Sequence, residues 1–179
     1  MSRRYPRSAV ILHGVLAVSV FFLFASSWWM LALPLPSETF RFREFPFQLH
    51  KNIGITLVLV VAVLLYVRLR HRPGPVHGPG VRPWMHPLAV IDHAIIYLLV
   101  LAVCVTGYLS SSYSGWGTTL WWLVELPYWG HEDDDLNMFW SDLHLWTCWA
   151  LLAAVAVHVG GALYHAFAND GVVRRMLHL

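Results

Sequence analysis

Four long apolar segments constrain the fold of this 179-residue chain more than any other feature. They cover about residues 9–33, 49–67, 88–110 and 137–168, and a helix needs about 20 apolar residues to cross a bilayer. Only helices and closed barrels satisfy their backbone hydrogen bonds in lipid, and runs this long without alternation are helices. Charged residues make up 12% of the chain, about half the share in a soluble protein. The sequence therefore predicts an all-α membrane protein, one four-helix transmembrane bundle over residues 1–179.

Basic residues are unevenly distributed between the segments that join these helices. Nine of the twelve lie near the N-terminus, between the second and third helices, and at the C-terminus. Four spans place both termini on one side, and the side richer in Lys and Arg is cytoplasmic. We therefore expect cytoplasmic N- and C-termini. The net charge of +2 is too small to suggest binding to nucleic acid.

Histidines stand out inside the apolar segments. His144 and His158 are 14 residues apart on one predicted helix, which is close to four turns, so both project from one face about 21 Å apart along the axis. His13 lies near the inner end of the first helix, and His50 opens the second helix near the outside. Matching by depth pairs His13 with His158 and His50 with His144. The sequence thus predicts two bis-histidine sites stacked across the bilayer.

Paired imidazoles suit one kind of metal centre in particular. Two axial histidines are typical of haem iron that transfers electrons without binding oxygen. Zinc prefers four close nitrogen or sulfur ligands, whereas these ligands come in twos. Gly14, Gly54, Gly160 and Gly161 lie near the ligands and let a flat macrocycle approach the backbone, although small residues also let membrane helices pack closely. A histidine-lined metal or proton transporter is the non-redox alternative.

Several stretches of the chain together resemble the bacterial cytochrome b561 family. They are YPRSAVILH (5–13), HKNIG (50–54), HAIIYLL (93–99) with Thr106 and Gly107, His144, HVGGALYH (158–165) and NDGVVRRM (169–176). The resemblance implies a four-helix bundle with two haem b groups in its interior, their irons bound by His13, His158, His50 and His144. It also implies a multi-pass protein of the bacterial inner membrane that reacts with quinone.

Within that family, the nearest functional type implied by the resemblance is a superoxide oxidase. Such an oxidoreductase takes electrons from superoxide on the outer side and passes them to ubiquinone. Similar cytochromes instead serve as haem-bearing membrane anchors and electron conduits for a separate dehydrogenase or hydrogenase, which is the alternative. The outer segment from Glu132 to Asp135 is acidic, whereas a surface that collects superoxide is expected to be positive.

Further cations and one histidine complete the candidate site. Haem propionates seek arginine, which makes Arg7 a candidate on the inner side and Arg41 and Arg43 candidates on the outer side. Lys51 follows His50 directly and is the expected catalytic cation, placed to stabilise a propionate, a bound semiquinone or an incoming superoxide anion. His93, beside Asp92 at the inner end of the third helix, is expected either to serve a quinone as an oriented proton relay or to bridge helices.

One short segment outside the four spans also has a predicted structure. Residues 118–126 are rich in Trp and Leu, and tryptophan collects at the membrane interface. We expect a short interfacial helix there.

Overall fold

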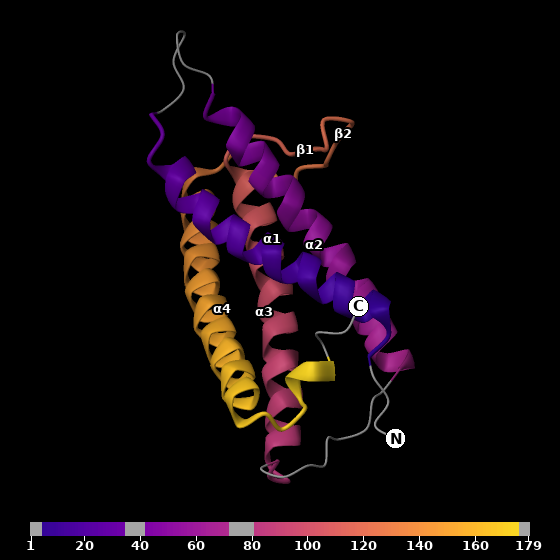
Figure 1. The fold of residues 1–179 in the computed structure, drawn as a ribbon. Coiled ribbons are helices and arrows are strands. Elements are labelled where there is room, and N and C mark those ends of the chain that lie inside the picture. Colours follow the sequence, from indigo (N-terminus) through magenta and orange to yellow (C-terminus); the bar gives the residue numbers. More distant parts are fainter. Residues whose placement is uncertain (1–4, 35–41, 72–80, 176–179) are drawn as a thin grey trace.

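The computed structural model describes residues 5–34, 42–71 and 81–175 (Figure 1). It contains four long helices, α1 (Arg7–Leu31), α2 (Glu44–Arg70), α3 (Met85–Tyr113) and α4 (Asp134–Ala168). Between α3 and α4 lie two short strands, β1 (Thr119–Leu120) and β2 (Val124–Glu125), and a 3-10 turn (Val173–Arg175) follows α4. Each of the four helices is long and apolar enough to cross a membrane. The predicted four-helix transmembrane bundle is confirmed.

All four helices extend beyond the apolar segments at one or both ends. Helix α2 begins at Glu44 and contains Pro46, and α3 begins at Met85 and contains Pro87. Proline is tolerated in a first turn, because the N–H it lacks has no partner there. Asp133 caps α4 by accepting a 2.9 Å hydrogen bond from the backbone N–H of Leu136, as N-cap residues commonly do. Hydropathy does not detect these polar first turns. In the structure His50 lies nearly two turns inside α2, whereas the sequence predicts it at the start of that helix.

Residues 118–126 form a β-hairpin rather than the interfacial helix expected from the sequence. The strands pair in antiparallel register, Thr119 with Glu125 and Leu120 with Val124. Trp121 and Trp122 form the turn with φ angles of 47° and 58°, a left-handed conformation that costs non-glycine residues about 1–2 kcal/mol each. Hydrogen bonds from α2 to this hairpin hold the turn, and a reading of local sequence cannot reveal them.

The four helices pack as two pairs, α1 on α2 and α3 on α4, and α2 also contacts α3 (Figure 1). Within the described ranges, no Cα atom of α4 lies within 8 Å of one in α1 or α2. Side chains, rather than closely packed backbones, therefore make the contacts between α4 and the first pair. The buried apolar cluster draws on all four helices: Ala9, Leu16, Val20, Leu57, Val61, Leu64, Val100 and Leu151.

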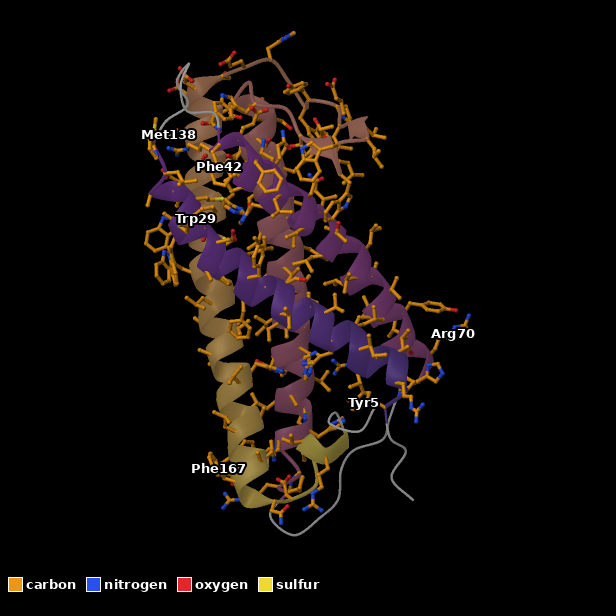
Figure 2. The ribbon with its side chains drawn as sticks, turned by 45° about the horizontal axis from the view of Figure 1, so that its top comes forward. Tyr5, Trp29, Phe42, Arg70, Met138 and Phe167 are labelled. Carbon is orange, nitrogen blue, oxygen red and sulfur yellow. The ribbon has the colours of Figure 1, made fainter. Side chains whose placement is uncertain are left out.

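The two ends of the bundle differ and are named here by their neighbours. The hairpin end carries the β1–β2 hairpin and the ends of helices at Leu31, Glu44, Tyr113 and Asp134, and the terminal end carries Arg7, Arg70, Met85 and Ala168. Aromatic side chains gather at the hairpin end, where Trp29 lies near Phe42 with ring centres 6.1 Å apart (Figure 2). Such aromatic groups are typical of helix ends at a membrane interface.

Candidate functional site

The structure brings together both pairs of histidines that were matched by depth. The ring centres of His50 and His144 are 6.5 Å apart at the hairpin end, and those of His13 and His158 are 6.0 Å apart nearer the terminal end. Each histidine pair joins α4 to α1 or α2, although the backbone of α4 is not packed closely against either helix. One helix therefore contributes a histidine to each of two separate sites.

These separations fit two imidazoles on opposite sides of one metal ion. A metal–imidazole bond of about 2 Å, with about 1.1 Å more to the ring centre, puts the two ring centres about 6.2 Å apart. The pairs at 6.0 and 6.5 Å lie on either side of this value. The ring centre of His93 is only 4.9 Å from that of His158, too close for a ligand on the opposite side of the same ion. His93 is therefore a neighbour of this site.

Hydrogen bonds at two of the four rings select the nitrogen that can bind a metal. Nδ1 of His144 lies 3.0 Å from the carbonyl oxygen of Val103 and 3.3 Å from the hydroxyl of Thr106. Nδ1 of His158 lies 2.7 Å from Oδ2 of Asp92. A ring that donates its Nδ1–H to an oxygen keeps the lone pair of Nε2 for a metal. Both histidines of α4 are thus held in the tautomer that ligation through Nε2 requires.

His50 contributes independent support for a bound group. Its Nδ1 is buried and has no hydrogen-bond partner among the described residues. Buried polar atoms in folded proteins almost always have a partner, and a metal bound at Nδ1 itself would account for the exception. At the hairpin end the chemistry fits haem better than zinc, because among the described residues the His50–His144 pair offers two imidazoles and not four close ligands.

The glycines near the ligands fall into two classes. A Cβ atom added to Gly14, Gly54, Gly160 or Gly161 would meet no heavy atom within 4 Å, so there is room beside the ligands for a flat group. Gly107 is the opposite case, because its Cβ would come within 2.9 Å of Cε1 of His144. The sequence around Gly107 does not indicate a role for this residue. Its proximity to His144 becomes visible only once α3 packs on α4.

A polar cluster surrounds the histidine pair nearer the terminal end. Ligand atoms of Asp92, His93 and His158 lie within 4.8 Å of one another. The guanidinium group of Arg68 donates a 3.4 Å hydrogen bond to the hydroxyl of Tyr97, whose ring centre is 6.3 Å from that of His93. The sequence predicts Asp92 beside His93, and Arg68 enters its pattern only as a basic residue that indicates the topology. The sequence does place Asp92, His13 and His158 at a similar depth in the membrane, and this was the available signal for the contact between Asp92 and His158.

The predicted cations occupy different environments. Nζ of Lys51 donates to the carbonyl oxygens of Trp116 at 2.8 Å and Gly117 at 3.2 Å, beside the His50 site. Arg43 donates a 2.7 Å hydrogen bond to the carbonyl oxygen of Leu33, beyond the end of α1. Arg7 is exposed at the start of α1, and Arg41 lies outside the described residues. Lys51 thus directly follows a paired histidine and also binds the loop after α3.

Two neighbours of Lys51 were missed by sequence reasoning. The fully buried Asn52 donates to the carbonyl oxygen of Thr119 at 3.0 Å and accepts from the backbone N–H of Trp121 at 2.7 Å. Gln48 donates to the carbonyl oxygen of Gly117 at 2.8 Å. These amides lie on one face of α2, since residues three or four apart are neighbours on a helix. The only sequence signal was their polarity and spacing, which do not identify the segment they bind.

Known proteins share these features along nearly the whole chain. The family described as "Prokaryotic cytochrome b561" matches residues 4–179. A protein of Escherichia coli (strain K12) named "Cytochrome b561 homolog 2" is 30% identical over 176 residues, which are 97% of this chain and 91% of that protein. The matched region includes all four helices and the four paired histidines. The chain therefore belongs to the prokaryotic cytochrome b561 family of transmembrane haem b electron-transfer proteins.

Proposed function

We propose that this protein carries electrons across the membrane through two haem b groups and exchanges them with the quinone pool. His50 and His144 hold one haem, and His13 and His158 hold the other. The observation that carries the proposal is the pair of ring separations, 6.5 and 6.0 Å, at two levels of the same helix α4. When bound, each haem supplies a one-electron carrier whose potential the protein tunes.

The residues of the chain prepare both sites for electron transfer rather than for oxygen chemistry. The two histidines of each pair would hold a haem iron, which would supply one-electron transfer without a further ligand at the metal. The carbonyl oxygen of Val103 orients His144 and the carboxylate of Asp92 orients His158. Fixed ligands keep the same geometry in both oxidation states, which lowers the reorganisation that accompanies each transfer.

The reaction that best fits the resemblance is oxidation of superoxide coupled to reduction of ubiquinone. Two superoxide anions each lose one electron and become dioxygen, and the two electrons with two protons convert ubiquinone to ubiquinol. In this proposal the hairpin end faces the periplasm, where superoxide meets the His50 site. Lys51 supports the assignment, because a cation beside an axial ligand attracts an anion and stabilises a reduced, more negative haem.

A specific observation favours the second candidate, a haem-bearing anchor for a separate dehydrogenase or hydrogenase. The hairpin end carries the acidic run from Glu132 to Asp135, which is exposed in the structure. The ammonium group of Lys51 is engaged by two carbonyl oxygens. An acidic surface repels superoxide but suits a partner protein with a basic docking surface.

Haem counting tests the proposed ligands. Purified wild-type protein should contain two haems per chain by pyridine haemochrome analysis. His144→Ala and His158→Ala should each lose a different one, recognised by its spectrum. His165→Ala is the matched control on α4, since its Nδ1 is 2.5 Å from Oδ2 of Asp170, and it should keep both. One haem or none in the wild-type protein, or an unchanged count in both ligand variants, contradicts the proposal.

The two candidate reactions are then separated with the same preparation. A superoxide oxidase reduces added ubiquinone in proportion to the superoxide supplied, with no other protein present. An anchor subunit lacks this activity and instead co-purifies from the native membrane with a redox subunit. Quinone reduction by the isolated chain supports the first candidate, and its absence together with a stable redox complex supports the second.

A further inference from the structure

The two histidine pairs differ in the group that orients the α4 ligand. His144 faces neutral oxygen atoms, the carbonyl of Val103 and the hydroxyl of Thr106. His158 faces a carboxylate, with 2.7 Å between its Nδ1 and Oδ2 of Asp92. Both of these side chains are largely buried, with 24% and 17% of their surface exposed. The sites are thus chemically distinct in a feature that acts directly on an axial ligand.

The carboxylate of Asp92 contacts His158 and forms no ion pair with a described Lys or Arg. It lies eight residues into α3, inside the segment predicted to cross the membrane, where a charged group is costly unless it is paired. Within the described residues, its only ion-pair or hydrogen-bond partner is His158. No Lys or Arg of the described residues forms an ion pair with Asp92. A buried carboxylate whose partner is a single imidazole N–H is a device for tuning that imidazole.

We propose that Asp92 is a positioning residue that lowers the reduction potential of the haem held by His13 and His158. This inference rests on the proposed function, because it requires that haem. By accepting the Nδ1–H of His158, the carboxylate fixes the ring and raises the basicity of Nε2. A more basic axial ligand stabilises the oxidised iron, so this haem is harder to reduce than the one whose ligand faces Val103.

The nearby groups are consistent with this assignment. His93 lies edge-on to His158, with ring centres 4.9 Å apart, but its Nδ1 is 2.5 Å from the carbonyl oxygen of Ala89 in its own helix. His93 therefore leaves the contact between Asp92 and His158 intact. The same three side chains lie close enough to ligate a divalent cation. The hydrogen bond occupies Nδ1 of His158 and Oδ2 of Asp92 and leaves Nε2 of His158 for the haem. We therefore assign these side chains to the haem site rather than to a separate cation site.

Three variants separate the charge of the carboxylate from its shape. Asp92→Asn keeps the size and an acceptor oxygen but removes the charge, and Asp92→Glu restores the charge. Asp170→Asn is the matched control, because Asp170 forms the same kind of contact with His165, which is not a proposed ligand. The readouts are haem content, an optical redox titration, and the electron paramagnetic resonance spectrum of the oxidised protein.

We expect Asp92→Asn to raise the midpoint potential of one haem and leave the other unchanged. The same haem should change its ferric resonance spectrum and be lost about 10- to 100-fold more readily, as for other partners of metal-binding histidines. Asp92→Glu should bring the midpoint back toward the wild-type value, and Asp170→Asn should move neither midpoint. If Asp92→Asn protein retains only one haem, recovery of the second haem in Asp92→Glu supports the same inference.

Other outcomes overturn the inference in recognisable ways. If both midpoints are unchanged in Asp92→Asn, Asp92 has no tuning role, although the proposed function stands as long as His158→Ala loses a haem. If His158→Ala keeps both haems, the proposed ligands themselves are wrong. Equal loss of haem in Asp92→Asn and Asp92→Glu indicates a packing role. Displacement of that haem by Zn²⁺ in wild type but not in Asp92→Asn makes the carboxylate a metal ligand instead.

Discussion

The imidazole of His144 lies against the backbone of Gly107, which leaves no room for a side chain at that position. A Cβ atom on Gly107 would come within 2.9 Å of Cε1 and 3.0 Å of Nδ1 of the ring. The ring has little freedom to move away, because Nδ1 is 3.0 Å from the carbonyl oxygen of Val103. Gly107 on α3 therefore determines where a ligand on α4 can lie.

Gly107→Ala should remove the haem held by His50 and His144 and leave the other in place. Alanine favours a helix by about 0.5–1 kcal/mol over glycine, but overpacking costs about 1–3 kcal/mol, so the ring must shift. Gly161→Ala is the control, because a Cβ there meets no atom within 4 Å. Pyridine haemochrome analysis should count one haem for Gly107→Ala, and the spectrum of the intact Gly161→Ala protein should still show the haem of the hairpin end. Two haems in Gly107→Ala would show that the ring adapts.

Asn52→Ala should destabilise the protein by roughly 2 kcal/mol, because buried groups left without partners cost about 1–3 kcal/mol each. The change removes the acceptor for the backbone N–H of Trp121 and the donor for the carbonyl oxygen of Thr119. Thermal unfolding in detergent should show a lower midpoint, and limited proteolysis should cut the β1–β2 hairpin. Ser27→Ala, whose hydroxyl bonds the carbonyl oxygen of Phe24 in its own helix, should change little.

Lys51→Glu should slow superoxide oxidation and weaken its dependence on salt, if superoxide is the substrate. Steering between exposed charges is screened over about 8–10 Å at physiological salt. The change also breaks contacts to Trp116 and Gly117, so Gln48→Leu, which loses a contact to Gly117 without a change of charge, is the matched control. Reduction of the haems by a neutral quinol should change less. Equal slowing in both variants would assign Lys51 to the structure of the loop.

Reporter fusions should place the terminal end in the cytoplasm. Nine of the twelve basic residues belong to that side in the predicted topology, and basic loops are retained in the cytoplasm. A fusion after Arg82 should behave as cytoplasmic, and a fusion near Asp134 as periplasmic. The opposite pattern would put the His13–His158 pair nearer the periplasm and reverse the proposed direction of electron flow.

The C-terminal turn should loosen in acid. Burial raises the pKa of Asp170, but the hydrogen bonds with His165 and the backbone N–H of Val172 outweigh it and hold this pKa below its usual value of 3.8. A carboxyl with a lowered pKa stabilises the fold above about pH 3.8, and this contribution is lost as the pH falls below that value. Hydrogen exchange at the amide of Val172, 3.1 Å from Oδ1 of Asp170, should accelerate there. Asp170→Asn should exchange fast at every pH.

The sequence predicted the features that depend on a single helix and missed those that depend on how helices are turned. The 14-residue interval between His144 and His158 fixes their common face and their spacing, and the structure places each beside the expected partner. Which residue of α3 faces His158 depends on the rotation of α3 against α4. That rotation is set by packing. The position of Asp92 beside His93 in the sequence therefore does not reveal that its hydrogen-bond partner is His158.

The β1–β2 hairpin shows a second limit. Two consecutive tryptophans in a left-handed turn contradict the usual preference for Asn and Gly there. Asn52 and Gln48, more than 60 residues away in sequence, hold it by accepting hydrogen bonds from the backbone N–H groups of Trp121 and Thr119. A local pattern records only local preferences, and tertiary contacts override it here.

Because α4 contributes a histidine to each pair, one rigid helix sets the length of the path between the two proposed redox centres. Movement of α1 or α2 changes the distance between the two histidines of a site, but it does not change the interval between His144 and His158 along α4. Inserting one residue between 144 and 158 would lengthen the interval by about 1.5 Å and rotate one histidine by about 100° relative to the other. Loops of such a protein can therefore vary in length, whereas this stretch of α4 tolerates substitution but not insertion or deletion.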